Sequence, residues 1–239
     1  MRSLLVGTII ALALPTLAAA QDAREERHTI TVTASGTITR EPDRATILLA
    51  VESFAATARE AADSNATRMQ AVIAALRRLG LTQEQIRTQS YDLYPEYDYD
   101  RQGATGEERL RGYRARNMVR VTLDDVARVG QIIDGAIAAG ANRVAGLNFE
   151  LRDPAAARAD ALRSAVESAR IEAEAIAAAI GRPLGPVISV NTGGPIAIPV
   201  PRASRMVMDA AVSAAPTPVE PGSLQVTATV TVIYRLEPR

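Results

Sequence analysis

Two neighbouring segments of opposite charge constrain the fold of this chain more than any other feature of its sequence. Residues 91–100 read YDLYPEYDYD and contain four of the six tyrosines and four carboxylates. Residues 109–123 read RLRGYRARNMVRVTL and contain five arginines. Only the glycine-containing loop 101–108 separates the two segments, and this arrangement predicts a β-hairpin.

Side chains two residues apart share a face of a strand. The first segment therefore divides into two sets, Tyr91, Leu93, Tyr97 and Tyr99 on one face and Asp92, Tyr94, Glu96, Asp98 and Asp100 on the other. The second divides into Tyr113, Ala115, Val119 and Val121 against Arg114, Arg116 and Arg120. Aligning the apolar faces places carboxylates opposite guanidinium groups, and each such pair contributes roughly 0.2–1 kcal/mol. Pro95 cannot donate to the ladder, which predicts an edge or a bulge there.

Two chemical functions compete with this structural interpretation of residues 91–100. Glu96, Asp98 and Asp100 could bind Ca²⁺, but the glycine and the closing glutamate of a calcium loop are missing. Paired carboxylates could also hydrolyse a glycosidic bond. Nearby arginines would lower the carboxyl pKa, whereas a general acid needs a raised pKa. We therefore predict a structural role for this segment.

The first 20 residues have the pattern of an export signal. Arg2 precedes the apolar run 4–14, and three alanines at 18–20 supply the small residues of a cleavage site. The run is shorter than the ~20 residues that a membrane-spanning helix needs. We predict cleavage after Ala20, which leaves residues 21–239 as one mature domain in the periplasm.

Composition removes several classes of function. The net charge is zero, which argues against a nucleic-acid partner. The chain contains arginine but no lysine, which excludes Schiff-base chemistry and a phosphate-loop lysine. No cysteine and one histidine, His28, exclude disulfides and ordinary zinc or copper sites. We predict no catalytic residues, no metal ligands and no cofactor, and interpret His28 as solvent-exposed.

Hydrophobic periodicity and capping residues predict an α+β fold with mixed or antiparallel sheets in the order ββαββαβαββ. The predicted strands are 28–40, 44–55, 85–98, 109–123, 141–151, 186–194 and 224–236. The predicted helices are 57–80, capped by Thr57 and Glu60, 126–140, and 153–181, capped by Asp153. Residues 44–99 and 113–151 share a strand–helix–strand plan, which suggests an internal duplication. Asp124 and Asp125 are interpreted as capping the second helix.

Residues 194–222 are rich in proline and alanine and are predicted to form a long flap with one helical turn near 206–211. Gly193 and Gly194 before a proline indicate a turn. The apolar cluster Met206 to Met208 has three interpretations of equal weight: a local plug, a tether, or a contact for another subunit.

Six segments resemble the SIMPL-domain family, and its bacterial periplasmic members in particular. They follow the order of the family and cover nearly all of residues 21–239: TVTASGTITREPDRATILLAVES, VIAALRRLGL, IRTQSYDLYPEYDYD, GYRARNMVRVTL, AGANRVAGLNFEL and EPGSLQVTATVTVIYRL. The resemblance implies an α+β fold of strand–helix–strand units, a periplasmic or outer-membrane-associated location, and large ring- or channel-like homo-oligomers. It also implies links to oxidative-stress tolerance and immunogenicity. The family has no agreed catalytic residues, so none is assigned here.

We therefore expect a non-enzymatic, exported protein that assembles with itself, with outer-membrane or other envelope components as further partners. Exposed strand edges and the 194–222 flap are the expected contacts, because uncovered edges and apolar flaps are otherwise liabilities. The alternative is a periplasmic module that binds a small molecule or a peptide in a pocket lined by Tyr91, Tyr97 and Tyr99.

Overall fold

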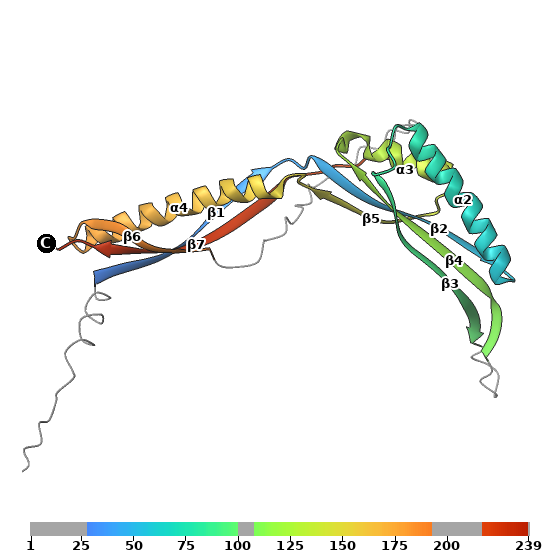
Figure 1. Ribbon diagram of the computed structural model, residues 1–239, viewed down its shortest axis with the longest axis horizontal. Helices are drawn as coiled ribbons and strands as arrows, with labels where there is room; N and C mark the ends of the chain where they lie inside the picture. Colours follow the sequence, from blue (N-terminus) through green and yellow to red (C-terminus); the bar gives the residue numbers. More distant parts are fainter. Residues whose placement is uncertain (1–27, 100–107, 193–216, 239) are drawn as a thin grey trace, which may run out of the picture. The chain divides into compact units, whose positions relative to one another are not determined.

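The computed structural model describes residues 28–99, 108–192 and 217–238 and divides them into two units (Figure 1). Unit 1 contains residues 28–36, 162–192 and 229–238. Unit 2 contains residues 37–99, 108–161 and 217–228. The chain is α+β, as predicted, and both units contain an antiparallel sheet.

Unit 2 is built on a four-stranded sheet in the order β3-β4-β2-β5. Its strands are β2 (Arg44–Ala55), β3 (Ile86–Tyr99), β4 (Glu108–Leu123) and β5 (Arg143–Glu150). Two helices, α2 (Ala58–Arg78) and α3 (Val129–Ala138), cover one face of this sheet, and the 3-10 turn η2 (Val126–Arg128) leads into α3 (Figure 1). The other face carries no helix of this unit, and it presents the charged rows of β3 and β4.

The core of unit 2 lies between the inner strands and the two helices. Ile47 and Leu49 of β2 and Val119 of β4 are fully buried there, together with Leu76 of α2 and Ile132 of α3. β2 pairs with β4 on one side and β5 on the other, which explains its nearly continuous apolar sequence. The prediction that residues 44–55 form an interior strand is confirmed.

Unit 1 is a three-stranded sheet in the order β1-β7-β6, with one face covered by a helix. Its elements are β6 (Leu184–Asn191) and the larger parts of β1 (Thr29–Arg40), α4 (Pro154–Ala179) and β7 (Leu224–Leu236), whose remaining residues belong to unit 2. In α4 every fourth residue from 165 to 177 is a buried alanine, and these alanines pack on Val32 of β1 and Val230 of β7. Alanine side chains are short, so the helix can lie close to both strands.

The other face of β1 and β7 is lined by hydroxyl groups that pair across the strands. Thr33 bonds Thr231 at 3.0 Å, and Ser35 bonds Thr229 at 2.9 Å. Residue numbers rise along β1 as they fall along β7, so the two strands are antiparallel. Threonine pairs of this kind stabilise a sheet while keeping its exposed face polar.

The predicted helix ends are present in the structure. Thr57 Oγ1 accepts a hydrogen bond from the Glu60 amide at 3.3 Å. Asp153 Oδ1 accepts from the first amides of α4, at 3.0 and 3.1 Å. Gly80 and Gly140 follow α2 and α3 with φ of 89° and 117°, a conformation that a side chain would strain.

Several boundaries differ from the sequence prediction. The predicted helix 126–140 is a 3-10 turn followed by a ten-residue α-helix, because Asp125 caps the turn through the Ala127 amide. The predicted strand 186–194 is β6, which starts at Leu184. The turn at Gly193 and Gly194 and the helical turn at 206–211 lie outside the described residues.

Asn65 joins α2 to the sheet and provides a test of this packing. Its buried Nδ2 donates to the carbonyl oxygens of Val51 at 2.8 Å and Ala115 at 3.0 Å. Asn65→Ala should lower the free energy of unfolding by about 1–3 kcal/mol, because it removes a donor that satisfies two buried acceptors. Urea denaturation measures the effect, with the exposed Gln70→Ala on the same helix as control. Equal losses in the two variants would contradict this role for Asn65.

Candidate functional site

The register of β3 and β4 brings together the acidic and basic rows that the sequence predicted. Asp92 lies opposite Arg116, Tyr94 opposite Arg114, and Asp98 opposite Arg109. β3 is an edge strand, and the register shifts directly after Glu96. Both alternatives predicted from Pro95, an edge strand and a nearby bulge, are therefore present. Asp100 and the side chain of Tyr99 lie outside the described residues.

The second face of the predicted hairpin turns toward the helices, although its outer part stays exposed. Leu93 lies opposite the fully buried Ala115, and Tyr91 lies opposite Asn117. Tyr91 is nevertheless 49% exposed and Leu93 is 41% exposed. This end of the sheet therefore carries large apolar side chains that no described part of the chain covers.

Glu52 of β2 is the centre of the ionic network on the helix-free face. Its carboxylate lies 3.0 Å from Arg143, 3.5 Å from Arg116 and 3.9 Å from Arg114. Asn142 holds the backbone of Glu52, accepting from its amide at 2.8 Å and donating to its carbonyl at 2.7 Å. Glu52 is not predictable from the sequence as a member of this network, because nothing in residues 44–55 indicates that β4 and β5 flank them.

A second carboxylate, Glu96 of β3, joins the network from the edge. It lies 2.6 Å from Arg114 and 3.1 Å from Arg111, and its hydrogen bond raises the pKa of Arg114. Both guanidinium groups also stack over the ring of Phe54, at 5.5 and 5.8 Å from its centroid. Phe54 is 44% exposed, so the stack partly shields it from water.

The ion pairs of this network fix the side chains of three neighbouring strands and of β5. Glu52 contacts three guanidinium groups and Glu96 contacts two, and Arg114 is shared between them. Charge-assisted contacts of this kind hold the carboxylates and the guanidinium groups in fixed positions on the sheet. Among the described residues, no group of three or more acidic, histidine or cysteine side chains could hold a metal ion.

The other residues singled out from the sequence lie apart from this network. His28 is exposed, and its Nδ1 lies 3.0 Å from the Arg182 guanidinium. Asp125 caps η2 as expected, but Asp124 pairs with Arg44 at 2.8 Å and does not cap the helix. That pairing lowers the pKa of Asp124. Met206 to Met208 lie outside the described residues.

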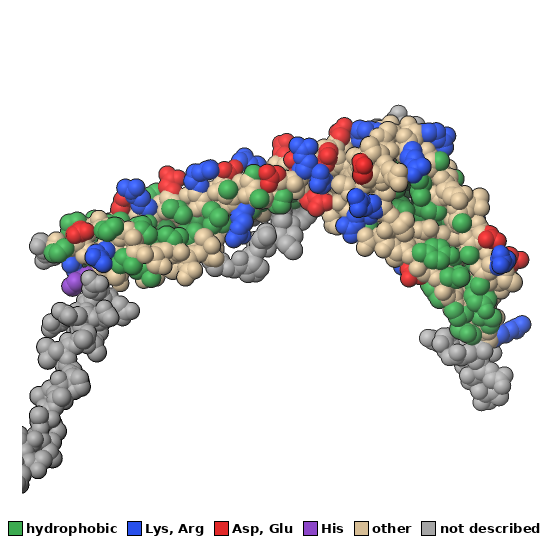
Figure 2. Space-filling model, viewed as in Figure 1, with side chains coloured by type: hydrophobic (Ala, Val, Ile, Leu, Met, Phe, Trp, Pro, Cys, Tyr) green, Lys and Arg blue, Asp and Glu red, His purple; other side chains and the backbone are tan. Residues whose placement is uncertain are grey.

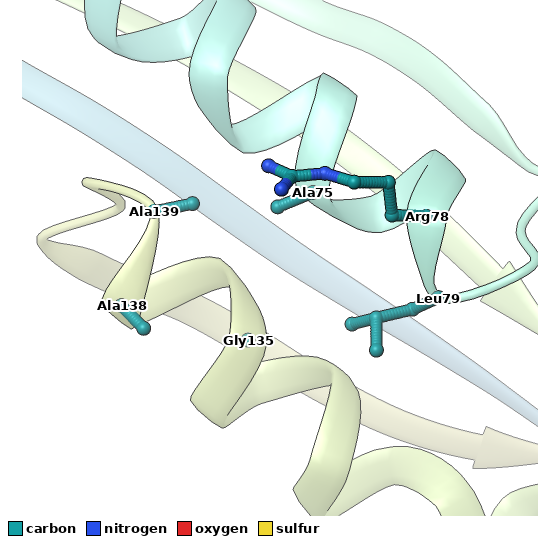
Figure 3. A pocket seen from close by; sticks show the side chains of 6 residues that line it. All are labelled: Ala75, Arg78, Leu79, Gly135, Ala138 and Ala139. Carbon is teal, nitrogen blue, oxygen red and sulfur yellow. The ribbon is translucent and has the colours of Figure 1, made fainter.

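Two cavities lie in unit 2, and neither is lined by Tyr91 or Tyr97. The first has a volume of about 320 Å³ and lies between α2 and α3 (Figure 3). Its lining residues are Ala75, Arg78, Leu79, Gly135, Ala138 and Ala139. The second, of about 530 Å³, lies where β3 begins and is lined by Gln83, Glu84, Ile86, Arg87 and Thr88. The predicted tyrosine-lined pocket is not among these two.

Glu52→Gln tests whether the ionic network stabilises the folded protein. The side chain of Glu52 is only 21% exposed, so removing its charge leaves three arginines without their shared partner. We expect the free energy of unfolding to fall by about 1–2 kcal/mol, and by less at high salt, because salt screens the lost attraction. Urea denaturation at two salt concentrations measures this, with the exposed Glu167→Gln as control. Unchanged stability of Glu52→Gln would show that the network does not hold the sheet.

Within the described residues, no helix has both the length and the hydrophobicity that crossing a bilayer requires. This holds for α4 as well, which is long but has charged residues along its exposed side.

Comparison with known proteins places the chain in a family. Residues 30–234 match the model of SIMPL, described as a protein of unknown function (DUF541). The 26 kDa periplasmic immunogenic protein of Brucella abortus (strain S19) is 30% identical, over 98% of this chain and 94% of that protein. The uncharacterized protein YggE of Escherichia coli (strain K12) is 30% identical, over 87% of this chain and 83% of that protein. The chain therefore belongs to the SIMPL family.

Proposed function

We propose that this chain is an exported periplasmic protein that performs no catalysis and assembles with copies of itself into a ring- or channel-like homo-oligomer. The observation that carries the proposal is the distribution of exposed apolar side chains. Surfaces of monomeric proteins usually spread such residues singly, whereas grouped ones mark interaction sites.

Many exposed apolar side chains gather on one surface in each unit (Figure 2), while others, such as Phe54 on β2 and Ile137 on α3, lie outside these groups. In unit 2 they lie on the outer parts of β3 and β4 and include Tyr91, Leu93, Tyr97 and Leu110, each between 41% and 49% exposed. In unit 1 they lie on β6 and α4 and include Val187, Ile188 and Val190, each between 49% and 52% exposed. Contact with other copies would remove both groups from water.

The periplasmic part of the proposal rests on the predicted export signal and on a relative. The Brucella protein is named periplasmic, and its similarity extends over 98% of this chain. We propose that the assembly contributes to envelope or oxidative-stress tolerance, because the resemblance to the family implies this role. Outer-membrane or other envelope components are the further partners that this role would require.

The solution mass of residues 21–239 tests self-assembly. We expect size-exclusion chromatography with light scattering to give a multiple of the single-chain mass at micromolar concentration, because the apolar groups of both units would then be covered. A single-chain mass across the micromolar range would refute the proposal. A separate variant tests whether the 194–222 flap takes part in the contact between copies. It replaces Met206, Val207 and Met208 with serine. If the flap forms a contact, this variant should weaken it and lower the solution mass.

The α2–α3 cavity supports a second candidate function, binding of a small amphipathic molecule. Five of its six lining residues are alanine, glycine or leucine, and the sixth, Arg78, brings a positive charge to the cavity (Figure 3). A volume of about 320 Å³ is at the small end of ligand sites. An aliphatic chain with one carboxylate fits this combination of an apolar lining and a single guanidinium group.

Octanoate is a suitable probe of this second function. At ten times its dissociation constant, a ligand adds about 1.4 kcal/mol to stability, which raises the melting temperature. We expect Ala138→Leu to abolish the rise by filling the cavity, and Arg78→Gln to weaken binding of octanoate but not of 1-octanol. A thermal shift that persists unchanged in Ala138→Leu would place the ligand elsewhere.

A further inference from the structure

β6 is an edge strand without charge, which is unusual for an exposed edge. Its sequence, LGPVISVN, contains no acidic or basic residue, and no described strand pairs with its outer side. The edge strands of unit 2 do carry charges, for example Arg87 and Asp92 on β3 and Arg143 on β5. Proteins place such charges on edges to prevent pairing with other chains, and β6 lacks them.

The opposite edge of the same sheet is also uncharged. β1 carries no acidic or basic residue before its last position, Arg40, and none of its described residues pairs with a strand beyond it. Within the described part of the chain, both edge strands of the unit 1 sheet therefore lack a partner strand on their outer side and lack charge before Arg40. β1 and β6 are both antiparallel to β7, so they run in the same direction.

Two valines of β6 lie on the face of the sheet that α4 covers, yet α4 does not cover them. Val187 pairs with Tyr234 and Val190 pairs with Val232, and both β7 partners are buried. Val187 and Val190 are instead 51% and 52% exposed. The buried core residues that α4 contacts lie on β1 and β7, and on β6 only Leu184 packs against them, so the rest of β6 extends beyond the helix as an apolar ledge.

α4 itself carries apolar residues on both of its flanks. Val166 follows the buried Ala165, and Ile176 precedes the buried Ala177. One residue turns a helix by about 100°, so these two side chains point to opposite sides of the buried stripe. They are 43% and 38% exposed. Apolar side chains on both flanks are unfavourable if both flanks face water. They are favourable if α4 lies between two apolar neighbours.

We propose that β6 of one copy pairs in parallel with β1 of a second copy, so that the sheet of unit 1 continues from chain to chain. This inference rests on the proposed self-assembly and names its contact. Three strands per copy would separate successive α4 helices by about 14 Å. Helices pack directly at 8–10 Å, so the remaining gap suits the valines of the ledge and the apolar flanks of both helices.

Pairing between two β6 strands fits the same surfaces less well. The core contacts of α4 lie on both β1 and β7, which centres the helix between them. Two copies joined through β6 would then place their helices about four strand spacings apart, or roughly 19 Å. The ledge would stay open to water, and both β1 edges would remain unpaired. A contact from β6 to β1 instead covers each edge and repeats, which gives a ring if the rotation closes.

Charge placed on the ledge tests the contact. The double variant Val187→Glu, Val190→Glu should reduce the assembly to the single-chain mass in light scattering, because two carboxylates would be buried between helices. The control is Ile171→Glu, since Ile171 is 62% exposed on α4 and lies away from both flanks. It should keep the wild-type mass. A double variant that retains the wild-type mass would overturn the inference.

The chain contains no cysteine, so introduced thiols can report the pairing directly in otherwise native protein. Ser189 pairs with Ile233, which puts it on the hydroxyl face with Thr33. A Ser189→Cys protein mixed with a Thr33→Cys protein should form a disulfide-linked dimer, as two α-carbons within about 7 Å allow. Thr31→Cys and Ser35→Cys cover the neighbouring registers.

The outcomes separate this inference from the proposed function. A wild-type chain that is monomeric overturns both. An oligomer in which Ser189→Cys cross-links only to itself indicates β6–β6 pairing. An oligomer without any of these cross-links indicates that another surface forms the contact. Either result overturns the inference but is consistent with self-assembly. Dimers formed only in the mixtures, together with a monomeric ledge variant, support it.

Discussion

The antiparallel ladder between β2 and β4 is the constraint on which the rest of unit 2 depends. It pairs Ala45 with Leu123 at one end and Ala55 with Tyr113 at the other, without a register shift. This one register sets both faces of the sheet at once. A slip by one residue would place Glu52 under the helices and Val51 in water, so burial and charge enforce the same alignment.

Local signals in the sequence predicted most elements of the fold. The caps at Thr57 and Asp153 and the glycines at 80 and 140 mark helix ends by backbone chemistry that acts within a few residues. The β3–β4 hairpin was predictable because its loop is short and its two rows are of opposite charge. The predicted duplication and the roles of residues 194–216 are not tested by the described residues.

Pairings between distant segments could not be predicted in this way. β1 pairs with β7 from the other end of the chain, and the alternating sequences of both strands fit many partners equally well. The same limit hid Glu52, whose three arginines come from β4 and β5. The exposure of β6 could not be predicted for the same reason, because a short apolar strand has the same sequence pattern whether it is central or at an edge.

The two units differ in where charged side chains lie on their sheets. In unit 2, paired carboxylates and arginines occupy the helix-free face, and the edge strands carry charge. In unit 1, hydroxyl pairs occupy the helix-free face, and both edges lack charge over most of their length. Charge therefore lies on both edge strands of the unit 2 sheet, whereas among the described residues the edge strands of the unit 1 sheet carry none before Arg40.

Deuterium exchange of the β6 backbone amides tests this account most directly, because a paired edge amide is protected and an open one is not. If a second copy covers β6, exchange at residues 184–191 should slow markedly as the protein concentration rises from nanomolar to micromolar. The amides in the interior of α2, which belong to a single chain, should exchange equally at both concentrations. Exchange at β6 that is fast and independent of concentration would contradict the account.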